Sequence, residues 1–133
     1  MADGYALTAY GLPHAMGFLP ARDGTRPEYP LTLDALIDAA AEMGLAGVDA
    51  PIPGDADPER LRERLAGRGL RLVAECGCIV DGEPQAAAEQ LRRAATAGAK
   101  VVRFTLSAVR CGDRRTLPGG WAARIDAVAE RLR

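Results

Sequence analysis

"LDALIDAAAEMGLAGVDAP", residues 33–51, carries the pattern that decides the fold. An amphipathic stretch rich in Ala and Leu runs into a glycine, then into a short β-branched run, and then reaches a charged residue. The same order recurs in "ERLRERLAGRGLRLVAEC", residues 59–76, and in "EQLRRAATAGAKVVRFT", residues 89–105. A helix that ends at a glycine and is followed by a strand accounts for each segment. The sequence therefore predicts a repeating unit of one helix and one strand.

Capping residues and glycines mark where these helices begin and end. Thr32 can cap the first helix, and Asp57 can cap the second, which has Pro58 at its first position. The glycines that stand where a helix C-terminus needs a left-handed residue are Gly44, Gly69 and Gly98. The expected apolar stripes are Leu33, Leu36, Ile37, Ala40 and Met43 on the first helix, Leu91, Ala94 and Ala95 on the third, and Trp121, Ile125, Val128 and Leu132 on a fourth.

The order of the elements predicts an α/β fold. "YALTAYG", residues 5–11, indicates an opening strand, so the expected order is βαβαβαβα with parallel strands. Four such units make about half of the roughly 250 residues of a TIM (β/α)8 barrel. Because the fourth helix runs to Arg133 with no fifth strand after it, we expect residues 1–133 to form a single partial domain, the N-terminal (βα)4 half of such a barrel. The alternative is a small open doubly wound sheet.

Composition and charge exclude several classes of function. The chain has 133 residues, is 48% hydrophobic and 26% charged, and has a formal net charge of -1, which offers no field for gathering nucleic acid or anionic lipid. No stretch approaches the roughly 20 apolar residues of a membrane span. We expect a cytoplasmic protein that binds neither nucleic acid nor membrane.

Charged residues interrupt the apolar runs at equivalent points of three predicted strands. These residues are Asp49, Glu75 and Arg103, and we expect the strands to end there. In parallel β/α folds the functional site lies at the carboxyl ends of the strands, so the three residues are candidates for binding a substrate. Glu75 and Arg103, on neighbouring strands, are expected to pair. A structural ion pair inside the barrel and a solvated strand end are the alternatives.

His14 and the three cysteines are the other candidates for chemistry. His14 is the single histidine and lies in a loop rich in Gly and Pro, so it is either a surface residue or a further substrate-binding candidate. Cys76 and Cys78 have one residue between them, whereas zinc sites and redox pairs need at least two. With Cys111 as the third cysteine, reduced thiols are the simplest interpretation and no metal site is expected.

The helix and strand segments also resemble a known family. "LTLDALIDAAAEMGLAGVDAPIP" at 31–53, "LRERLAGRGLRLVAECG" at 61–77 and "LRRAATAGAKVVRFTLS" at 91–107 resemble the N-terminal half of the sugar phosphate isomerase/epimerase family, the xylose-isomerase-like TIM barrels. "YGLPHAMGFL" at 10–19, together with "CGDRR" and "GGW", looks like one bacterial branch of that family.

The resemblance implies an enzyme that moves a proton between adjacent carbons of a sugar or sugar phosphate with the help of a divalent metal of the Mn or Mg type. In the family the metal ligands come from strands five to eight, so none is expected here and the chain alone should be inactive. His14 and Glu75 match positions that contact substrate, Asp49 stands where the family more often has Glu, and Arg103 matches the arginine of its "VVR" motif. The family also includes DNA-repair endonucleases, so the fold alone does not fix the substrate.

Two other functions are compatible with the residues. One is a non-catalytic half-barrel that associates with a second copy or with a partner half, because four strands leave two exposed edges and an apolar inner face. The other is a complete open-sheet binding protein whose ligand lies above Asp49 and Glu75.

Overall fold

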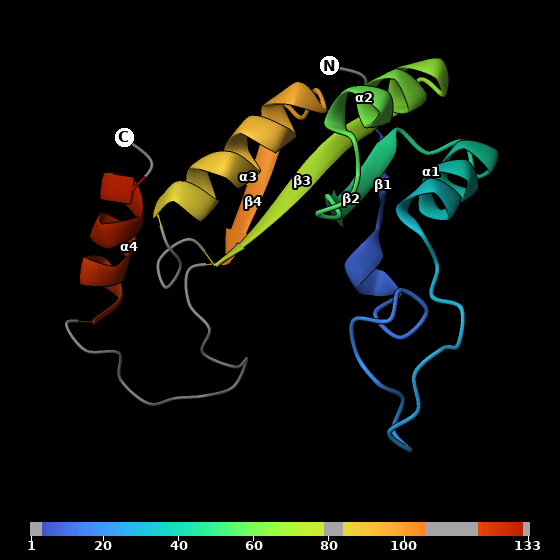
Figure 1. The fold of residues 1–133 in the computed structure, drawn as a ribbon, viewed down its shortest axis with the longest axis horizontal. Coiled ribbons are helices and arrows are strands. Elements are labelled where there is room, and N and C mark those ends of the chain that lie inside the picture. The colour runs from blue at the N-terminus through green and yellow to red at the C-terminus, as the bar shows by residue number, and fades with distance from the viewer. Residues whose placement is uncertain (1–3, 79–83, 106–119, 132–133) are drawn as a thin grey trace.

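The computed structural model describes residues 4–78, 84–105 and 120–131. Within them, β1 (Ala6–Thr8), β2 (Gly47–Pro51), β3 (Arg71–Cys78) and β4 (Val101–Thr105) form one parallel sheet in the order β1-β2-β3-β4 (Figure 1). One helix follows each strand: α1 (Leu33–Glu42), α2 (Pro58–Gly67), α3 (Pro84–Thr96) and α4 (Gly120–Arg131). The predicted α/β fold of four βα units is confirmed.

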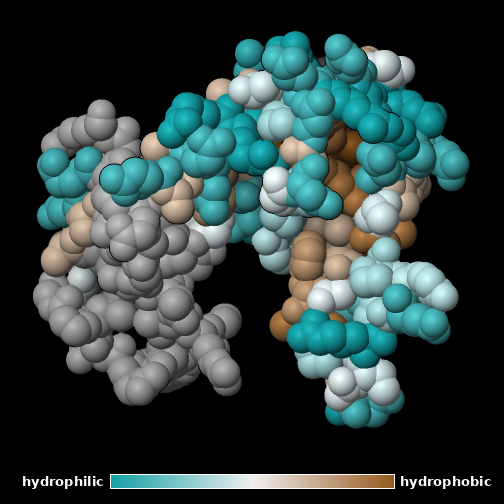
Figure 2. Space-filling model, viewed as in Figure 1, coloured by the Kyte–Doolittle hydropathy of each residue, from teal (hydrophilic) through white to brown (hydrophobic). Residues whose placement is uncertain are grey.

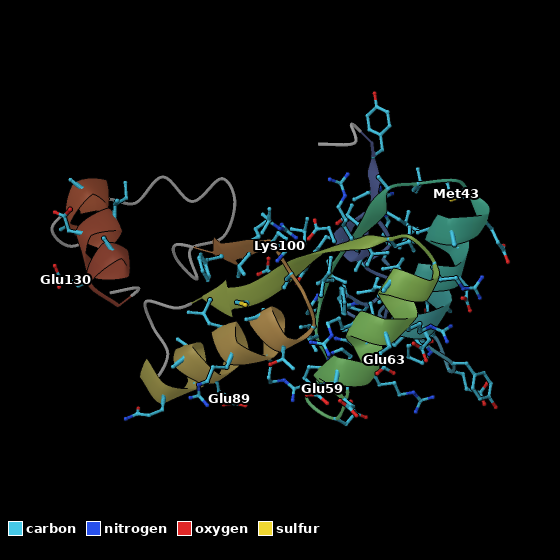
Figure 3. The ribbon with its side chains drawn as sticks, turned by 90° about the horizontal axis from the view of Figure 1, so that it is seen from above. Met43, Glu59, Glu63, Glu89, Lys100 and Glu130 are labelled. Atoms are coloured by element: carbon cyan, nitrogen blue, oxygen red, sulfur yellow. The ribbon has the colours of Figure 1, made fainter. Side chains whose placement is uncertain are left out.

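The strands follow one another across the sheet in chain order, without the reversal that a doubly wound sheet contains. The helices α1, α2 and α3 pack against the strands that precede or follow them. Figure 3 shows α2 and α3 along the same side of β3. Helices on one face of a sequentially ordered sheet favour the half-barrel over the doubly wound alternative. Continuation of the sheet to eight strands stays a prediction.

The helix ends follow the sequence signals closely. The Thr32 hydroxyl accepts a hydrogen bond from the Ala35 N–H at 3.2 Å, and the Asp57 carboxylate accepts one from the Glu59 N–H at 2.9 Å. The glycines that follow the first three helices have φ values of 67° (Gly44), 67° (Gly69) and 81° (Gly98). The predicted caps and left-handed turns are confirmed.

The core lies between the sheet and the three helices. Leu36, Ile37 and Val48 are the largest side chains that are fully buried. The other strand residues in the core are Ala50, Leu72, Ala74 and Cys76, and they alternate with residues that point to the opposite face. Figure 2 shows hydrophilic residues over the outward surfaces of the helices, with apolar residues gathered beneath them. The helices therefore bury one face of the sheet.

Several details of the predicted elements are wrong. Only Ala6–Thr8 of the opening strand is extended, and Ala9–Gly11 forms a 3-10 helix capped by the Thr8 side chain. Met43 is 63% exposed because α1 has ended at Glu42 and the chain is already turning toward Gly44. On α3, Ala95 is exposed, whereas Ala87 and Ala94 are buried, as is Ala97 just after the helix.

The strands also continue past their charged residues. β2 ends at Pro51, β3 at Cys78 and β4 at Thr105, so each charged side chain lies inside its strand. β3 continues through a register shift between Glu75 and Cys78, where Gly77 has a φ of 67°. A left-handed residue of this kind is typical of a β-bulge, and glycine adopts it without strain.

The face of the sheet turned away from α1, α2 and α3 is called the open face below. By strand register and alternation it includes Ala6, Thr8, Gly47, Asp49, Pro51, Arg71, Val73, Glu75, Val101 and Arg103. Val101 is 56% exposed, which is unusual for a valine in a strand. Figures 1 and 3 show α4 beyond α3 and apart from the sheet. None of the helices in the described ranges is both long and apolar enough to cross a membrane.

Candidate functional site

The three predicted charged residues meet on the open face. Glu75 lies directly opposite Arg103 in the β3–β4 register, and Asp49 lies opposite Val73, two residues before Glu75. Residues two apart in a strand point to the same face. The sheet therefore brings Asp49, Glu75 and Arg103 together, as expected.

Arg103 is the centre of this group. Its Nη2 atom lies 3.1 Å from Asp49 Oδ1 and donates a hydrogen bond to it, and its Nε atom lies 3.4 Å from Glu75 Oε2. To reach Asp49 on β2, the side chain crosses over β3. The predicted pairing of Glu75 with Arg103 is confirmed, and the structure adds Asp49 as a second partner.

The two carboxylates differ in their access to solvent. The Glu75 side chain is only 7% exposed, the Asp49 side chain 20%, and the Arg103 side chain 46%. Glu75 is also fixed from within its own strand, because its Oε1 atom accepts a hydrogen bond from the Gly77 N–H at 3.0 Å. Both carboxylate oxygens of Glu75 therefore have a partner, and its orientation is set by the bulge and by Arg103 together.

Tyr10 completes the group, and sequence reasoning did not identify it. The Arg103 Cζ atom lies 4.9 Å from the centroid of the Tyr10 ring. The centroid of the Phe18 ring lies 5.4 Å from that of the Tyr10 ring. The 3-10 helix places Tyr10 here, and Thr8 Oγ1 accepts a hydrogen bond from its N–H at 3.3 Å. A Thr three residues before a Gly is the signal that could have predicted this turn.

The environment of Tyr10 favours its neutral form. Burial raises the pKa of Tyr10 above its ordinary value, and the nearby negative charge of Glu75 raises it further. The positive charge of Arg103 lowers the pKa of Tyr10, and the negative charge of Asp49 raises it. At neutral pH the hydroxyl is therefore protonated and can donate a hydrogen bond.

A cavity of about 240 Å³ lies at the carboxyl edge of β2 and β3. Its polar walls are Tyr10, Glu75, Gln90 and Arg93, and its other walls are Pro51, Ile52, Cys76 and Gly77. Arg93 on α3 donates hydrogen bonds from Nη2 to the carbonyl oxygens of Pro53 at 2.7 Å and Ala56 at 2.9 Å. It therefore holds the loop between β2 and α2 against the cavity. The volume suits a small metabolite, because cavities for drug-sized ligands start at about 300 Å³.

His14 lies away from this group. Its side chain is exposed, its carbonyl oxygen accepts a hydrogen bond from the Gly17 N–H at 2.9 Å, and it does not line the cavity. The pKa of Asp23 is lowered, first by a hydrogen bond from the Thr25 hydroxyl, and the charge of His14 is the last of its causes. Among the predicted site residues, the structure thus brings together Asp49, Glu75 and Arg103 and leaves His14 outside.

The described residues do not fit a divalent metal. Among them, no three His, Cys, Asp or Glu side chains are grouped so as to hold an ion. Asp49 and Glu75 are the two carboxylates that could contribute, and both face the guanidinium of Arg103, which a metal would have to displace. Cys76 is buried toward the helices, and burial raises the pKa of its thiol, so it is a poor ligand. Cys111 and the Cys78 side chain lie outside the described residues.

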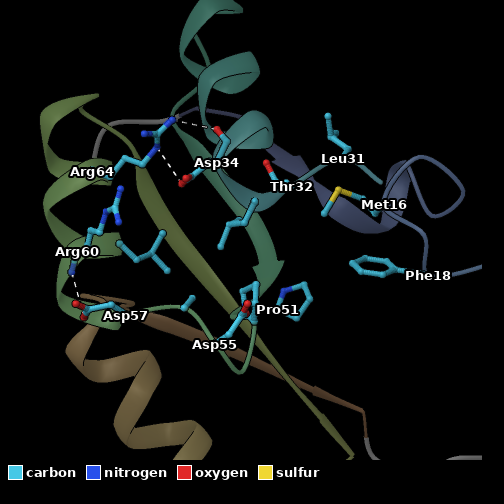
Figure 4. Close-up of a pocket in the computed structure, with 14 residues that line it drawn as sticks. Met16, Phe18, Leu31, Thr32, Asp34, Pro51, Asp55, Asp57, Arg60 and Arg64 are labelled. Carbon is cyan, nitrogen blue, oxygen red and sulfur yellow. Dashed lines mark hydrogen bonds and ion pairs between the residues drawn. The ribbon is translucent and has the colours of Figure 1, made fainter. Parts of the chain in front are cut away.

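A larger cavity, of about 530 Å³, lies on the helix side of the sheet (Figure 4). Met16 and Phe18 lie on one side of it, and Arg60 and Arg64 lie on the other. Several of its polar groups already have structural partners: Arg64 pairs with Asp34 at 3.1 Å, and Asp57 caps α2. None of the charged strand residues Asp49, Glu75 and Arg103 lines this larger cavity, whereas Glu75 lines the smaller one. The smaller cavity is therefore the better candidate for chemistry.

Comparisons with known proteins do not assign the chain. A scan against protein-family models finds no match, and a search of the curated proteins also finds none.

Proposed function

We propose that the chain is the N-terminal half of a sugar or sugar phosphate isomerase/epimerase of the xylose-isomerase-like type, and that its open face contributes substrate contacts. The observation that carries this proposal is the convergence of one polar residue from each strand or the turn after it: Tyr10, Asp49, Glu75 and Arg103. The motif resemblance of residues 31–53, 61–77 and 91–107 supports it.

The chemistry of the group suits the hydroxyls of a sugar. Tyr10 offers an O–H donor, Glu75 and Asp49 offer acceptors, and Gln90 at the cavity wall offers both. Glu75 is well oriented because both of its oxygens have partners. We assign these residues to binding and orienting the sugar and assign no catalytic residue on this chain. Isomerisation needs a carboxylate base and a group that stabilises the enediolate-like intermediate.

The resemblance also implies a divalent metal for the full-length protein. Because the described residues do not fit one, the proposal places its ligands on strands five to eight of the full barrel, as in the family. A cytoplasmic location is also part of the proposal, and the buried free thiol of Cys76 fits a reducing compartment.

A titration of the isotope-labelled chain with D-xylose tests the binding role. We expect the amide signals of residues 75–77 and the Nε signal of Arg103 to shift, and we expect Glu75→Gln to weaken the effect at least about tenfold by removing a charged acceptor. Glu63→Gln, an exposed residue on α2, is the matched control and should change nothing. Shifts confined to the larger cavity, or equal effects of the two variants, would contradict the binding role.

An activity assay tests the other part of the proposal. The purified 133-residue chain, supplied with Mn²⁺ or Mg²⁺, should not isomerise or epimerise a sugar. Clear turnover by this chain would show that it holds a complete site.

A second candidate is a non-catalytic half-barrel that associates with itself or with a partner half. The observation that favours it is the open face, where Val101 is 56% exposed and Arg103 46%. β1 and β4 are also the edge strands of the described sheet. Sedimentation of the chain tests the first of these two forms, because a chain that stays monomeric would argue against obligate self-association.

A further inference from the structure

The small cavity at the carboxyl edge of β2 and β3 has one negative and one positive side chain in its wall, Glu75 and Arg93. Glu75 has a counter-ion, because it pairs with Arg103. Arg93 donates hydrogen bonds to the carbonyl oxygens of Pro53 and Ala56, and these groups carry no formal charge. No ion pair found in the described ranges includes Arg93. Its guanidinium is therefore charged and, within these ranges, without a counter-ion.

The charges of the open face do not supply one. Arg103 pairs with both Asp49 and Glu75. Arg71 lies on the same face, one row from Asp49 in the strand register, so the two carboxylates and the two guanidinium groups of this face sum to zero. Arg93 comes from α3 and adds one positive charge at the cavity.

The carboxylates on either side of Arg93 in the loop and on the helix have other positions. Asp55 and Asp57 lie in the loop that Arg93 holds, but they line the larger cavity, and Asp57 caps α2. On α3, Glu89 pairs with Arg92. None of these carboxylates lines the small cavity, so the place of an anion beside Arg93 is open to a ligand.

The geometry of Arg93 leaves donors for such a ligand. Its Nη2 atom donates to the carbonyl oxygens of Pro53 at 2.7 Å and Ala56 at 2.9 Å, which accounts for both N–H groups of that nitrogen. A guanidinium has five N–H donors, so the three on Nε and Nη1 remain. Because these two hydrogen bonds already hold the side chain, a ligand loses little affinity to ordering it.

A carboxylate suits this single cation better than a phosphate does. A carboxylate carries one negative charge and accepts paired hydrogen bonds from a guanidinium. A phosphate ester carries a charge of about -1.5 to -2 at neutral pH, which exceeds the one positive charge of Arg93. The excess would lie in the same cavity as Glu75, whose side chain is only 7% exposed, and like charges repel strongly where water is scarce.

We propose that the small cavity binds a sugar acid of the uronate type, with its carboxylate on Arg93 and its hydroxyls on Glu75 and Tyr10. Gln90, in the same wall, can donate a second hydrogen bond to the carboxylate. A uronate keeps the carbonyl group that an isomerase needs and carries its negative charge at the other end, so the two ends of the cavity orient it. The proposal rests on the proposed sugar-binding role of this site but not on a metal or on turnover.

Three hexoses with the same carbon skeleton serve as probes. D-glucose, D-glucuronate and D-glucose 6-phosphate differ only in the neutral, carboxylate or phosphate group at carbon 6. In isothermal titration calorimetry of the purified chain at neutral pH, we expect a dissociation constant for D-glucuronate at least about tenfold below that for D-glucose, and also below that for the phosphate. Arg93→Gln should abolish the preference for D-glucuronate over D-glucose. Arg93→Lys retains the charge and should retain most of the preference.

The ratio of the D-glucose and D-glucuronate dissociation constants separates charge from structure. A loosened loop between β2 and α2 weakens both sugars alike, whereas loss of the Arg93 charge weakens only the acid. Arg92→Gln, at an exposed neighbouring position of α3, is the matched control and should leave the ratio unchanged.

Three results would each overturn the sugar acid as the ligand: equal binding of D-glucose and D-glucuronate by the wild type, tighter binding of the phosphate, or a preference that survives Arg93→Gln. If D-glucose still shifts the amide signals of residues 75–77, the proposed sugar-binding role stands without this refinement. Absence of binding by all three sugars would overturn both.

Discussion

Arg103 on β4 reaches across β3 to Asp49 on β2, with 3.1 Å between its Nη2 atom and Asp49 Oδ1, and it pairs with Glu75 on the way. One side chain thus connects three of the four strands on the open face. The same contacts hold Glu75 in a fixed orientation and place a guanidinium under the ring of Tyr10. Structural support and candidate binding chemistry therefore depend on one residue.

Replacement of Arg103 by Met should destabilise the fold. Asp49 and Glu75 would lose their shared cation, and Glu75 is only 7% exposed. We expect a loss of about 2 kcal/mol in the free energy of unfolding, below the range for a fully buried pair because Arg103 is itself half exposed. Urea denaturation measures it. Arg92→Met, which breaks an exposed ion pair with Glu89 on α3, should cost less than about 0.5 kcal/mol, and equal losses would refute the structural role of Arg103.

Replacement of Arg93 by Met should loosen the loop between β2 and α2. The two hydrogen bonds to the carbonyl oxygens of Pro53 and Ala56 would be lost, at a cost of about 1–2 kcal/mol. Hydrogen exchange followed by mass spectrometry should show faster exchange in residues 52–57. The neighbouring Arg92→Met is the control. Unchanged exchange in this loop would mean that the loop is held by other contacts.

Tyr10 should make stability depend on pH in the alkaline range. Its pKa is raised in the folded state, so the folded chain binds the phenolic proton more tightly than the unfolded chain does. The contribution of this proton to the free energy of unfolding is fully present below the pKa that Tyr10 has in the unfolded chain, about 10. It is lost as the pH rises through the higher pKa of Tyr10 in the folded chain. Urea midpoints of the wild type should fall more steeply above about pH 10 than those of Tyr10→Phe. Parallel curves would contradict the raised pKa.

The same pKa also reports on Glu75. Glu75→Gln removes a negative charge that raises the pKa of Tyr10, so the pKa should move down toward its ordinary value. Absorbance at alkaline pH in a Tyr5→Phe, Tyr29→Phe background isolates the Tyr10 signal. Glu63→Gln should leave the titration unchanged, and a rise of the Tyr10 pKa in Glu75→Gln would show that the two groups do not interact in this way.

Two glycines should respond in opposite ways to alanine. A Cβ atom on Gly47 would collide with the carbonyl oxygen of Arg71 on the neighbouring strand, so Gly47→Ala should cost about 2 kcal/mol. A Cβ atom on Gly67, at the end of α2, meets nothing within 4 Å, and Gly67→Ala should stabilise the helix by about 0.5–1 kcal/mol. Thermal unfolding of both variants gives the comparison, and a tolerated Gly47→Ala would contradict the close approach of β2 and β3.

The local structure could be predicted because its causes are local. Thr32 and Asp57 cap helices through hydrogen bonds to backbone N–H groups two or three residues away. Gly44, Gly69 and Gly98 end helices because glycine adopts positive φ without strain. Since strands separated by helices are parallel, these signals also predicted the fold class and the shared face of Asp49, Glu75 and Arg103.

The errors arose where distant parts of the chain compete with local preference. Residues 9–11 continue the run predicted as the opening strand, yet they leave the sheet as a 3-10 helix. This places Tyr10 against Arg103, 93 positions away in the sequence. Strand alternation could not show that β3 continues past Glu75, because the bulge at Gly77 breaks the period of two.

The sequence by itself determined the helices, their caps, the βα repeat and the face on which the charged residues lie, because each depends on backbone preferences and periodicity over a few residues. Only the tertiary structure decided that Arg103 bridges two carboxylates, that Tyr10 joins them and that His14 does not. Those contacts depend on the spacing of neighbouring strands and on the path of the chain after β1, and both are set by how the sheet and helices pack together.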